Sequence, residues 1–279
     1  MLRSLVGSEM CIRDRILSFH SSLPPEERLN SPKLCFGMEI QKTSDTVLKK
    51  LTEGEALVFG LLTDSHYVVN GTWGDTLANI SAVNDRVGFD GLIHLGDLQD
   101  GMLDKKMCRR IATKCISDMR HICEPLYMTI GNHDTNYFKG NTEWLTEAEQ
   151  YGLYGRFMDN YVCREKQNGW YYVDYSKHGL RMIFLSSFNH REELRYGFPE
   201  EEIFWIKRVL KATPSDYKVL IFSHDAPLEE LDYWASDIRN GEALMNVLET
   251  YHNMQGHCVL GYIHGHTHAC LLYTSDAAD

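Results

Sequence analysis

The chain contains five short, nearly continuous apolar runs, at residues 56–63, 91–95, 126–130, 218–222 and 258–263. Runs of this length without polar alternation are typical of strands that are buried on both faces. Patterns typical of helices lie between the runs, at residues 72–87, 104–123 and 199–211. Strands that alternate with helices predict an α/β fold built of layered sheets.

The second and third helical patterns have further support. In the second, apolar residues recur every three or four positions, at Cys108, Ile111, Cys115, Met119 and Ile122. The third opens with a proline and three glutamates, which favour a helix N-terminus. An alternating stretch at residues 170–175 is expected to pair with residues 180–185 in a hairpin.

Each apolar run is followed by residues with oxygen or nitrogen donors, which are Asp64, His66, Asp97, Asn132, His133, Asp134, His224, His266 and His268. In open α/β sheets, ligands bind beyond the carboxyl ends of the strands, so these side chains are expected to meet there. Paired metal ions that clamp a phosphoryl group need such a set of donors.

Taken singly, most of these residues have ordinary interpretations. Asp64 is typical of a turn or a helix cap, Gly96-Asp97 is a common turn, and a lone His224 is more often a hydrogen-bonded core residue. On strands, Asp64 and His66 would point to one side, and so would His266 and His268. The His-x-His spacing after a glycine is the most specific of the five patterns.

The chain resembles the calcineurin-like metallophosphoesterase superfamily, whose motifs D-x-H, G-D, G-N-H-D/E, H and G-H-x-H occur here in order between Leu57 and His268. The resemblance implies a fold in which β-sheets form a central sandwich flanked by helices. It also implies two metal ions, of which the first is held by Asp64, His66, Asp97 and His268. The second would be held by Asp97, Asn132, His224 and His266.

The resemblance further implies that a hydroxide between the ions attacks phosphorus. His133 would act as the general acid, and Asp134 would orient it. Mixed oxygen and imidazole ligands suit manganese, iron or zinc better than magnesium.

Two departures from known subfamilies narrow the substrate. Asp100 stands where purple acid phosphatases carry a tyrosine ligand, and residues 98–103 lack the arginine of calcineurin-type protein phosphatases. A small phosphomonoester or phosphodiester is therefore the expected substrate. The alternative is a catalytically silent metal-binding interaction module on the same fold.

The composition of the chain limits the partners and the surroundings that can be expected for it. A net charge of −11 argues against an extended nucleic-acid surface, because duplex binding depends on Lys and Arg that neutralise phosphates. No apolar run approaches the ~20 residues that cross a bilayer. Eight cysteines without Cys-x-x-Cys pairs suggest a reducing compartment such as the cytoplasm.

Both ends of the chain are expected to be non-native. Residues 1–15 and 270–279 resemble translations of the two strands of a sequencing adapter, and residues 16–37 are a doubtful upstream segment. Residues 38–269 then form a single domain, expected to be truncated at its C-terminus.

Residues 135–180 form an aromatic-rich insert directly after the proposed acid. Most of its rings are expected to pack in the core or on the surface. The alternative is a wall over the site that stacks a base or a sugar. Arg191 and Arg195 are candidates to hold a substrate phosphate, although a solvated face is their more ordinary interpretation.

Overall fold

Two β-sheets form the centre of the protein in a computed structural model that describes residues 31–231 and 237–268. The first sheet is parallel and contains β1 (Phe59–Leu62), β2 (Gly91–His94) and β3 (Leu126–Met128), in that order. The second has the order β4 (Tyr171–Tyr175), β5 (Leu180–Phe184), β6 (Lys218–Phe222) and β7 (Cys258–Ile263). Only β4 and β5 pair antiparallel within it, and the remaining neighbours are parallel.

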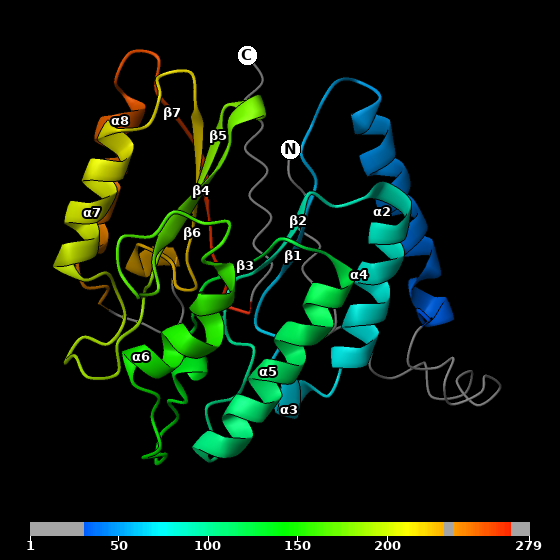
Figure 1. Cartoon of the computed structure of the whole chain (residues 1–279), viewed down its shortest axis with the longest axis horizontal. Coiled ribbons are helices and arrows are strands. Elements are labelled where there is room, and N and C mark those ends of the chain that lie inside the picture. The colour runs from blue at the N-terminus through cyan, green and yellow to red at the C-terminus, as the bar shows by residue number, and fades with distance from the viewer. Residues whose placement is uncertain (1–30, 232–236, 269–279) are drawn as a thin grey trace.

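Helices cover the outer sides of the two sheets (Figure 1). On one side lie α2 (Gly37–Leu51), α4 (Trp73–Val87) and α5 (Lys105–Ile122), and on the other lie α7 (Glu200–Lys211) and α8 (Gly241–His252). Two short helices, α3 (Tyr67–Asn70) and α6 (Glu147–Gln150), lie at one end of the molecule. The predicted α/β fold with layered sheets is confirmed.

The predicted elements agree closely with the structure. The three helices that the patterns indicate are α4, α5 and α7, the five apolar runs contain β1, β2, β3, β6 and β7, and the hairpin is β4 with β5. Four helices were not predicted, the short α3 and α6 and the longer α2 and α8. Both longer helices carry an apolar stripe, at Ile40, Val47 and Leu51 in α2 and at Leu244, Leu248 and Tyr251 in α8.

Side chains of β5 and β6 point alternately to the two faces of the second sheet, so this sheet contributes to two hydrophobic cores. Met182 and Phe184 of β5 face the first sheet, and Ile183 of β5 faces α7 and α8. In β6, Phe222 likewise faces the first sheet, and Ile221 faces α7 and α8. Successive strand residues point to opposite faces, so a strand covered on both sides is apolar throughout.

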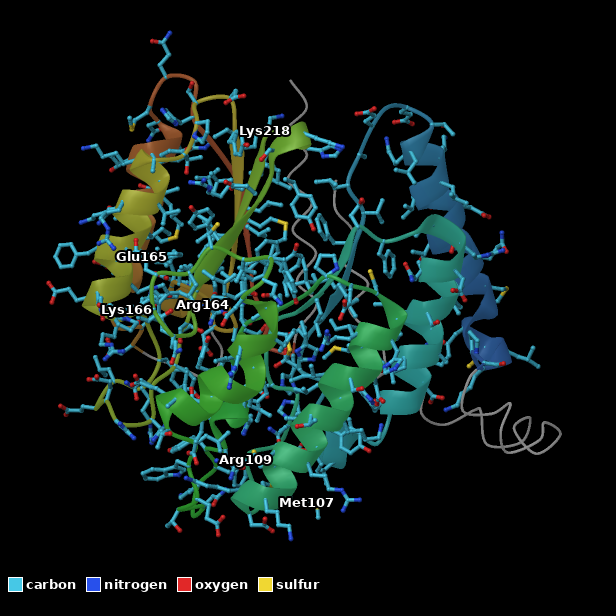
Figure 2. All side chains as sticks on the ribbon, in the orientation of Figure 1. Met107, Arg109, Arg164, Glu165, Lys166 and Lys218 are labelled. Atoms are coloured by element: carbon cyan, nitrogen blue, oxygen red, sulfur yellow. The ribbon has the colours of Figure 1, made fainter. Side chains whose placement is uncertain are left out.

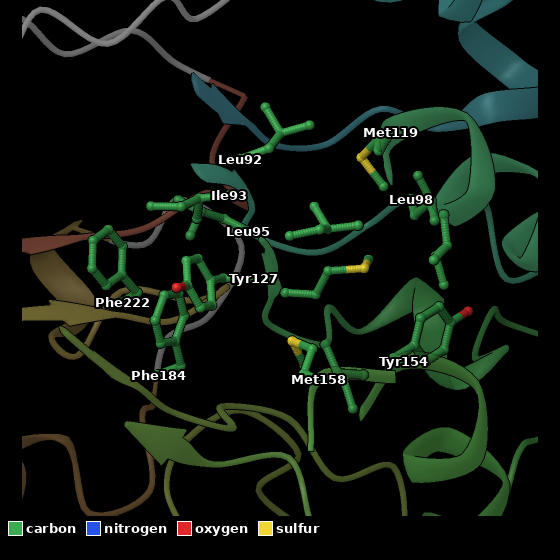
Figure 3. Close-up of a cluster of buried hydrophobic side chains, with 14 of the residues drawn as sticks. Leu92, Ile93, Leu95, Leu98, Met119, Tyr127, Tyr154, Met158, Phe184 and Phe222 are labelled. Atoms are coloured by element: carbon green, nitrogen blue, oxygen red, sulfur yellow. The ribbon is translucent and has the colours of Figure 1, made fainter. Parts of the chain in front are cut away.

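Aromatic rings fill the space between the sheets (Figure 3). The ring of Phe184 is stacked on those of Tyr171 and Phe222, each with a centroid distance of 4.7 Å, and on Tyr127 of the first sheet at 5.6 Å. The hydroxyl of Tyr171 accepts the N–H of Met128 and donates to the carbonyl of Met128, both at 2.9 Å. Tyr171 thereby ties β4 to the outer strand of the first sheet.

The aromatic-rich insert contributes to this core, as expected for most of its rings. Tyr154 and Tyr171 are fully buried, and Phe157 and Tyr161 pack against the same cluster. In the described ranges the cysteines are free thiols, and no helix there has the length and apolar character to span a bilayer.

Phe184→Ala should lower the free energy of unfolding by about 3–5 kcal/mol, because it removes the ring on which both sheets pack. Urea denaturation followed by circular dichroism measures this change. Phe204→Ala, at a half-exposed position of α7, should change stability by less than about 0.5 kcal/mol. Equal losses in the two variants would contradict this role of Phe184.

Glu202→Gln should stabilise the protein more at pH 8 than at pH 5. Glu202 is buried in the first turn of α7 and accepts the N–H of Ser186 at 2.7 Å. Burial raises the pKa of Glu202 well above its usual value, outweighing that hydrogen bond and the charge of Arg239. Its contribution to stability is therefore present below the unfolded pKa and is lost as the pH rises towards the folded pKa.

Urea denaturation of both proteins at the two pH values measures this difference. Glu200→Gln, an exposed position on the same turn, is the matched control. A gain from Glu202→Gln that is equal at pH 5 and pH 8 would show that the carboxyl group is not held neutral.

Candidate metal centre

The predicted site residues lie in five loops, each of which follows the carboxyl end of a strand. The strands concerned are β1, β2, β3, β6 and β7. Lys218, at the start of β6, lies at one end of the molecule, and Met107 and Arg109 of α5 lie at the other (Figure 2). The strand thus runs from Lys218 towards the end that carries α3 and α6.

Asp97 stands at the centre of the site, and its side chain is only 1% exposed. Its Oδ2 lies 3.2 Å from His224 Nε2, 3.8 Å from His66 Nε2 and 4.0 Å from His133 Nε2. Its Oδ1 accepts the backbone N–H of His133 at 2.8 Å. A buried carboxylate needs a cation or strong donors around it, and here imidazole rings surround it.

The donors form two main groups, Asp64 with His66 and His268 and Asp97 with His224 and His266, and a third cluster of His66, Asp97 and His133 links them. In the first, His66 Nε2 lies 3.1 Å from His268 Nε2, which lies 3.3 Å from Asp64 Oδ1. The second group contains His224, whose Nε2 is 3.2 Å from both Asn132 Oδ1 and His266 Nδ1. Within each group the candidate atoms of the histidines and carboxylates lie within 4.8 Å of one another.

The hydrogen bonds of the rings show that this arrangement fits metal ions. His224 Nδ1 lies 2.8 Å from the carbonyl oxygen of Leu95, so Nδ1 carries the proton and donates it. In the neutral ring, Nε2 then presents a lone pair to the oxygens of Asp97 and Asn132. These electron-rich atoms repel one another unless a proton or a metal cation lies between them.

The pKa values of the two buried histidines of the second group are shifted by burial and by the charges packed around them. Burial lowers the pKa of His224, but the carboxylates of Asp97 and Asp225 outweigh burial and raise it well above its usual value. Burial lowers the pKa of His266 to about 3, and the charge of His224 acts in the same direction. The carboxylates therefore favour positive charge at His224, which a bound cation would supply in place of a proton, and His266 stays neutral, as a ligand must be.

The backbone brings the ligands together by a geometry that differs from the expected one. Asp64 and His66 were expected to share a side by strand alternation, and this expectation was wrong, because β1 ends at Leu62. Their φ angles are +51° and +40°, in the left-handed region. His266 and His268 likewise lie beyond β7, with φ angles of +67° and +50°, rather than on an extended segment.

Two motif glycines allow the loops after β2 and β3 to touch. A Cβ atom on Gly131 would lie 2.2 Å from Asp97 Oδ1, and one on Gly96 would lie 2.6 Å from the Gly131 nitrogen. The φ of Gly96 is +97°, which also favours glycine. Backbone contact between these two loops places Asn132 and His133 beside Asp97.

His133 lies at the edge of the site, and its side chain is 22% exposed. Its Nδ1 is 3.2 Å from the carbonyl oxygen of Tyr137, which leaves Nε2 directed towards the Asp97 side. Burial lowers the pKa of His133. Asp134 was expected to orient this ring, but its two oxygens accept the backbone N–H groups of Leu98 and Gly131, each at 3.0 Å.

Asp134 thus fixes the loops that follow β2 and β3, and the Tyr137 carbonyl holds the imidazole ring of His133. Burial, together with the charge of Asp97, raises the pKa of Asp134 to about 7. A backbone carbonyl leaves no mark in a sequence, so the contact from Tyr137 had no signal that could have revealed it.

Two further carboxylates contact the ligand rings and were not assigned from the sequence. Asp100 Oδ1 lies 3.5 Å from His66 Nδ1, and Asp225 Oδ1 lies 3.4 Å from His266 Nδ1. Asp225 Oδ2 in turn accepts the hydroxyl of Ser187 at 2.6 Å. Their positions, three residues after Asp97 and one after His224, were the only signals available.

Of the remaining polar candidates, one is buried beside the site and two are exposed. His94 is buried and bonds Ser65 Oγ at 2.9 Å, in keeping with a structural role. Arg195 is exposed and donates to the hydroxyl of Tyr137. Arg191 is exposed as well.

A solved structure has a similar fold. A dimetal phosphatase from Danio rerio matches with a TM-score of 0.52 and 16% identity, over 77% of this chain and 82% of that chain. Phosphopantetheinyl hydrolase from Mycobacterium tuberculosis matches with a TM-score of 0.42 and 12% identity, over 76% of this chain and 83% of that chain.

No curated protein matches the chain by sequence. A family profile does: residues 57–270 match that of the calcineurin-like phosphoesterases, from the strand before Asp64 to just beyond His268. This is well over half of the chain, and the protein belongs to the calcineurin-like phosphoesterase family.

Proposed function

We propose that the protein hydrolyses a small phosphoester with the help of two metal ions. Membership of the family supports metal-dependent phosphoester hydrolysis in general. The observation that carries the proposal is the central carboxylate of Asp97, which faces ring nitrogens of both donor groups from within a fully buried position.

Asp64, His66, Asp97 and His268 would hold the first ion, and Asp97, Asn132, His224 and His266 the second. The convergence of these side chains in two groups supports this division. Oxygen and imidazole donors together suit manganese, iron or zinc. When bound, such ions activate water and offset the charge on the phosphoryl oxygens.

His133 is the proton donor of the proposed reaction. Water adds to phosphorus and loses a proton, the bond to the ester oxygen breaks, and Nε2 of His133 gives its proton to that oxygen, which leaves as an alcohol. The proton lost by the water restores the protonated ring. The contact of Nδ1 with the Tyr137 carbonyl fixes the ring for this transfer. The lowered pKa makes the imidazolium give up its proton more readily than an exposed histidine would.

The proposed activity predicts manganese-dependent turnover. Chelator-treated protein should hydrolyse neither para-nitrophenyl phosphate nor bis-para-nitrophenyl phosphate, and added manganese should restore hydrolysis of at least one. The compound that reacts faster indicates monoester or diester chemistry. Two bound ions per chain without turnover of either compound would favour the metal-binding interaction module instead.

The division of roles predicts different losses at two positions. His133→Ala should lower kcat by about 100- to 10,000-fold and leave bound metal unchanged, because the ring transfers a proton without holding an ion. Asp97→Ala should lose both ions, because its carboxylate lies beside His224 of one group and His66 of the other.

Metal content measured by atomic emission, together with kcat, separates the two effects. His178→Ala, in the exposed turn of the β4–β5 hairpin, is the control and should match the unchanged protein in both measurements. Equal loss of metal in the His133 and Asp97 variants would contradict the division.

A further inference from the structure

A set of aromatic side chains lines one flank of the candidate metal centre. We call it the aromatic rim, and it consists of Tyr137, Phe138, Trp144, Phe188, His190 and Tyr196. Its ring contacts follow one another: centroid distances are 6.3 Å from Tyr137 to Trp144, 5.5 Å from Tyr137 to Phe188 and 5.2 Å from Phe188 to Tyr196. His190 joins at Trp144, at 4.8 Å.

The rim touches the catalytic machinery at two points. The ring of Phe138 lies 5.9 Å from that of His133, with an interplanar angle of 32°. The ring of Tyr196 lies 5.1 Å from that of His266. The rim therefore extends from the proposed proton donor to a proposed ligand of the second ion, and the departing half of a substrate would lie beside Phe138.

The first of the two loops that carry the rim is held by side-chain amides. Asn136 Nδ2 donates to the carbonyl oxygen of Leu103, and Asn141 Nδ2 donates to that of Gly101 at 2.7 Å. Gly101 is pressed against this loop, since a Cβ on it would lie 2.3 Å from the Tyr137 carbonyl oxygen. The positions of Tyr137 and Phe138 are thus fixed before any ligand binds.

The second loop folds back on itself and is joined to the first. Phe188 and Tyr196 form an antiparallel bridge, and the N–H of Asn189 donates to the carbonyl of Arg195 at 2.8 Å. The guanidinium of Arg195 lies 5.2 Å from the Tyr137 ring and donates to the Tyr137 hydroxyl. The two loops therefore form one preorganised surface.

Two rings of the aromatic rim are more than a third exposed, whereas its Phe188 is buried. Phe138 is 37% exposed and Trp144 is 38% exposed, whereas Tyr154 and Tyr171 of the same insert are fully buried. Single exposed rings are common on protein surfaces, but a connected group of rings beside a reactive centre is typical of a binding surface. The rings stack readily on another planar π-system.

We propose that the aromatic rim binds a planar aromatic group in the departing half of the phosphoester. This inference rests on the proposed hydrolysis, and it narrows the substrate to a nucleoside phosphate or an aryl phosphate. Both classes carry the flat ring that Phe138 and Trp144 can stack against, and a polyol phosphate carries none. The rim adds selectivity through stacking and takes no part in bond breaking.

The test compares pairs of substrates that differ by the aromatic group. Adenosine 5′-monophosphate is paired with ribose 5-phosphate, and para-nitrophenyl phosphate with glycerol 3-phosphate, all with manganese present. At least one aromatic member should show a kcat/KM about ten-fold or more above its partner, in keeping with the strength of ring stacking. Para-nitrophenolate is also a better leaving group than an alkoxide, so the preference in that pair counts for the rim only where the rim variants reduce it. Preference for the nucleotide or for the aryl ester identifies the class.

Trp144→Ala should reduce that preference about ten-fold, mainly through KM, and Phe138→Leu should reduce it too. Phe204→Ala removes a comparably exposed ring on α7 and should leave the preference unchanged. The ratio between paired substrates reports recognition, since general damage to the fold would lower both members alike. Equal kcat/KM within both pairs, or a preference that survives both rim variants, would overturn the proposal.

Calorimetric titration separates a failure of the rim from a failure of the proposed activity. Tighter binding of adenosine 5′-monophosphate than of ribose 5-phosphate, reduced by Trp144→Ala, supports the rim even if no ester is hydrolysed. If the protein neither hydrolyses these esters nor distinguishes the two ligands in titration, both proposals fail. Hydrolysis of all four esters without preference overturns the rim alone.

Discussion

The structure of the site depends on the burial of one carboxylate. Asp97 is removed from water, yet its oxygens face three imidazole rings and one backbone N–H. A carboxylate in such surroundings requires neighbours that supply positive charge, and this requirement explains why histidines from three loops converge on it. The glycines at 96 and 131 follow from the same requirement, because a side chain at either position would occupy the space that these contacts need.

The fold brings these histidines to Asp97 because the carboxyl ends of the strands of both sheets lie at the same end of the molecule. Phe184 and Tyr171 hold the two sheets together, so loops of both sheets meet at the same end of the molecule. Without that contact, His224 and His266 from the second sheet could not reach Asp97 from the first. The aromatic core and the polar centre are therefore parts of one arrangement, although they lie in different environments.

The sequence predicted the strands well, and the candidate donors, each of which follows an apolar run whose length marks a buried strand, are side chains that the structure brings together. It predicted the local geometry poorly. Strand alternation suggested a common side for Asp64 and His66, but the backbone leaves the strand before both of them. The partner of His133 was missed for a different reason: the Tyr137 carbonyl acts through the main chain, which every residue shares. Contacts of Asp100 and Asp225 depend on which loops meet, and that is a property of the tertiary fold.

Five of the proposed ligand residues, Asp64, His66, Asp97, His266 and His268, have left-handed backbone angles. For residues with a side chain, this conformation costs roughly 1–2 kcal/mol each, a cost that glycine avoids. Selection for stability alone would replace these residues with glycine or asparagine and would dismantle the centre. In this chain a relaxed backbone and the set of proposed ligands therefore make opposite demands on the same five positions. A lineage freed from the proposed chemistry would lose the proposed ligands at these positions first, while the glycines beside them remained.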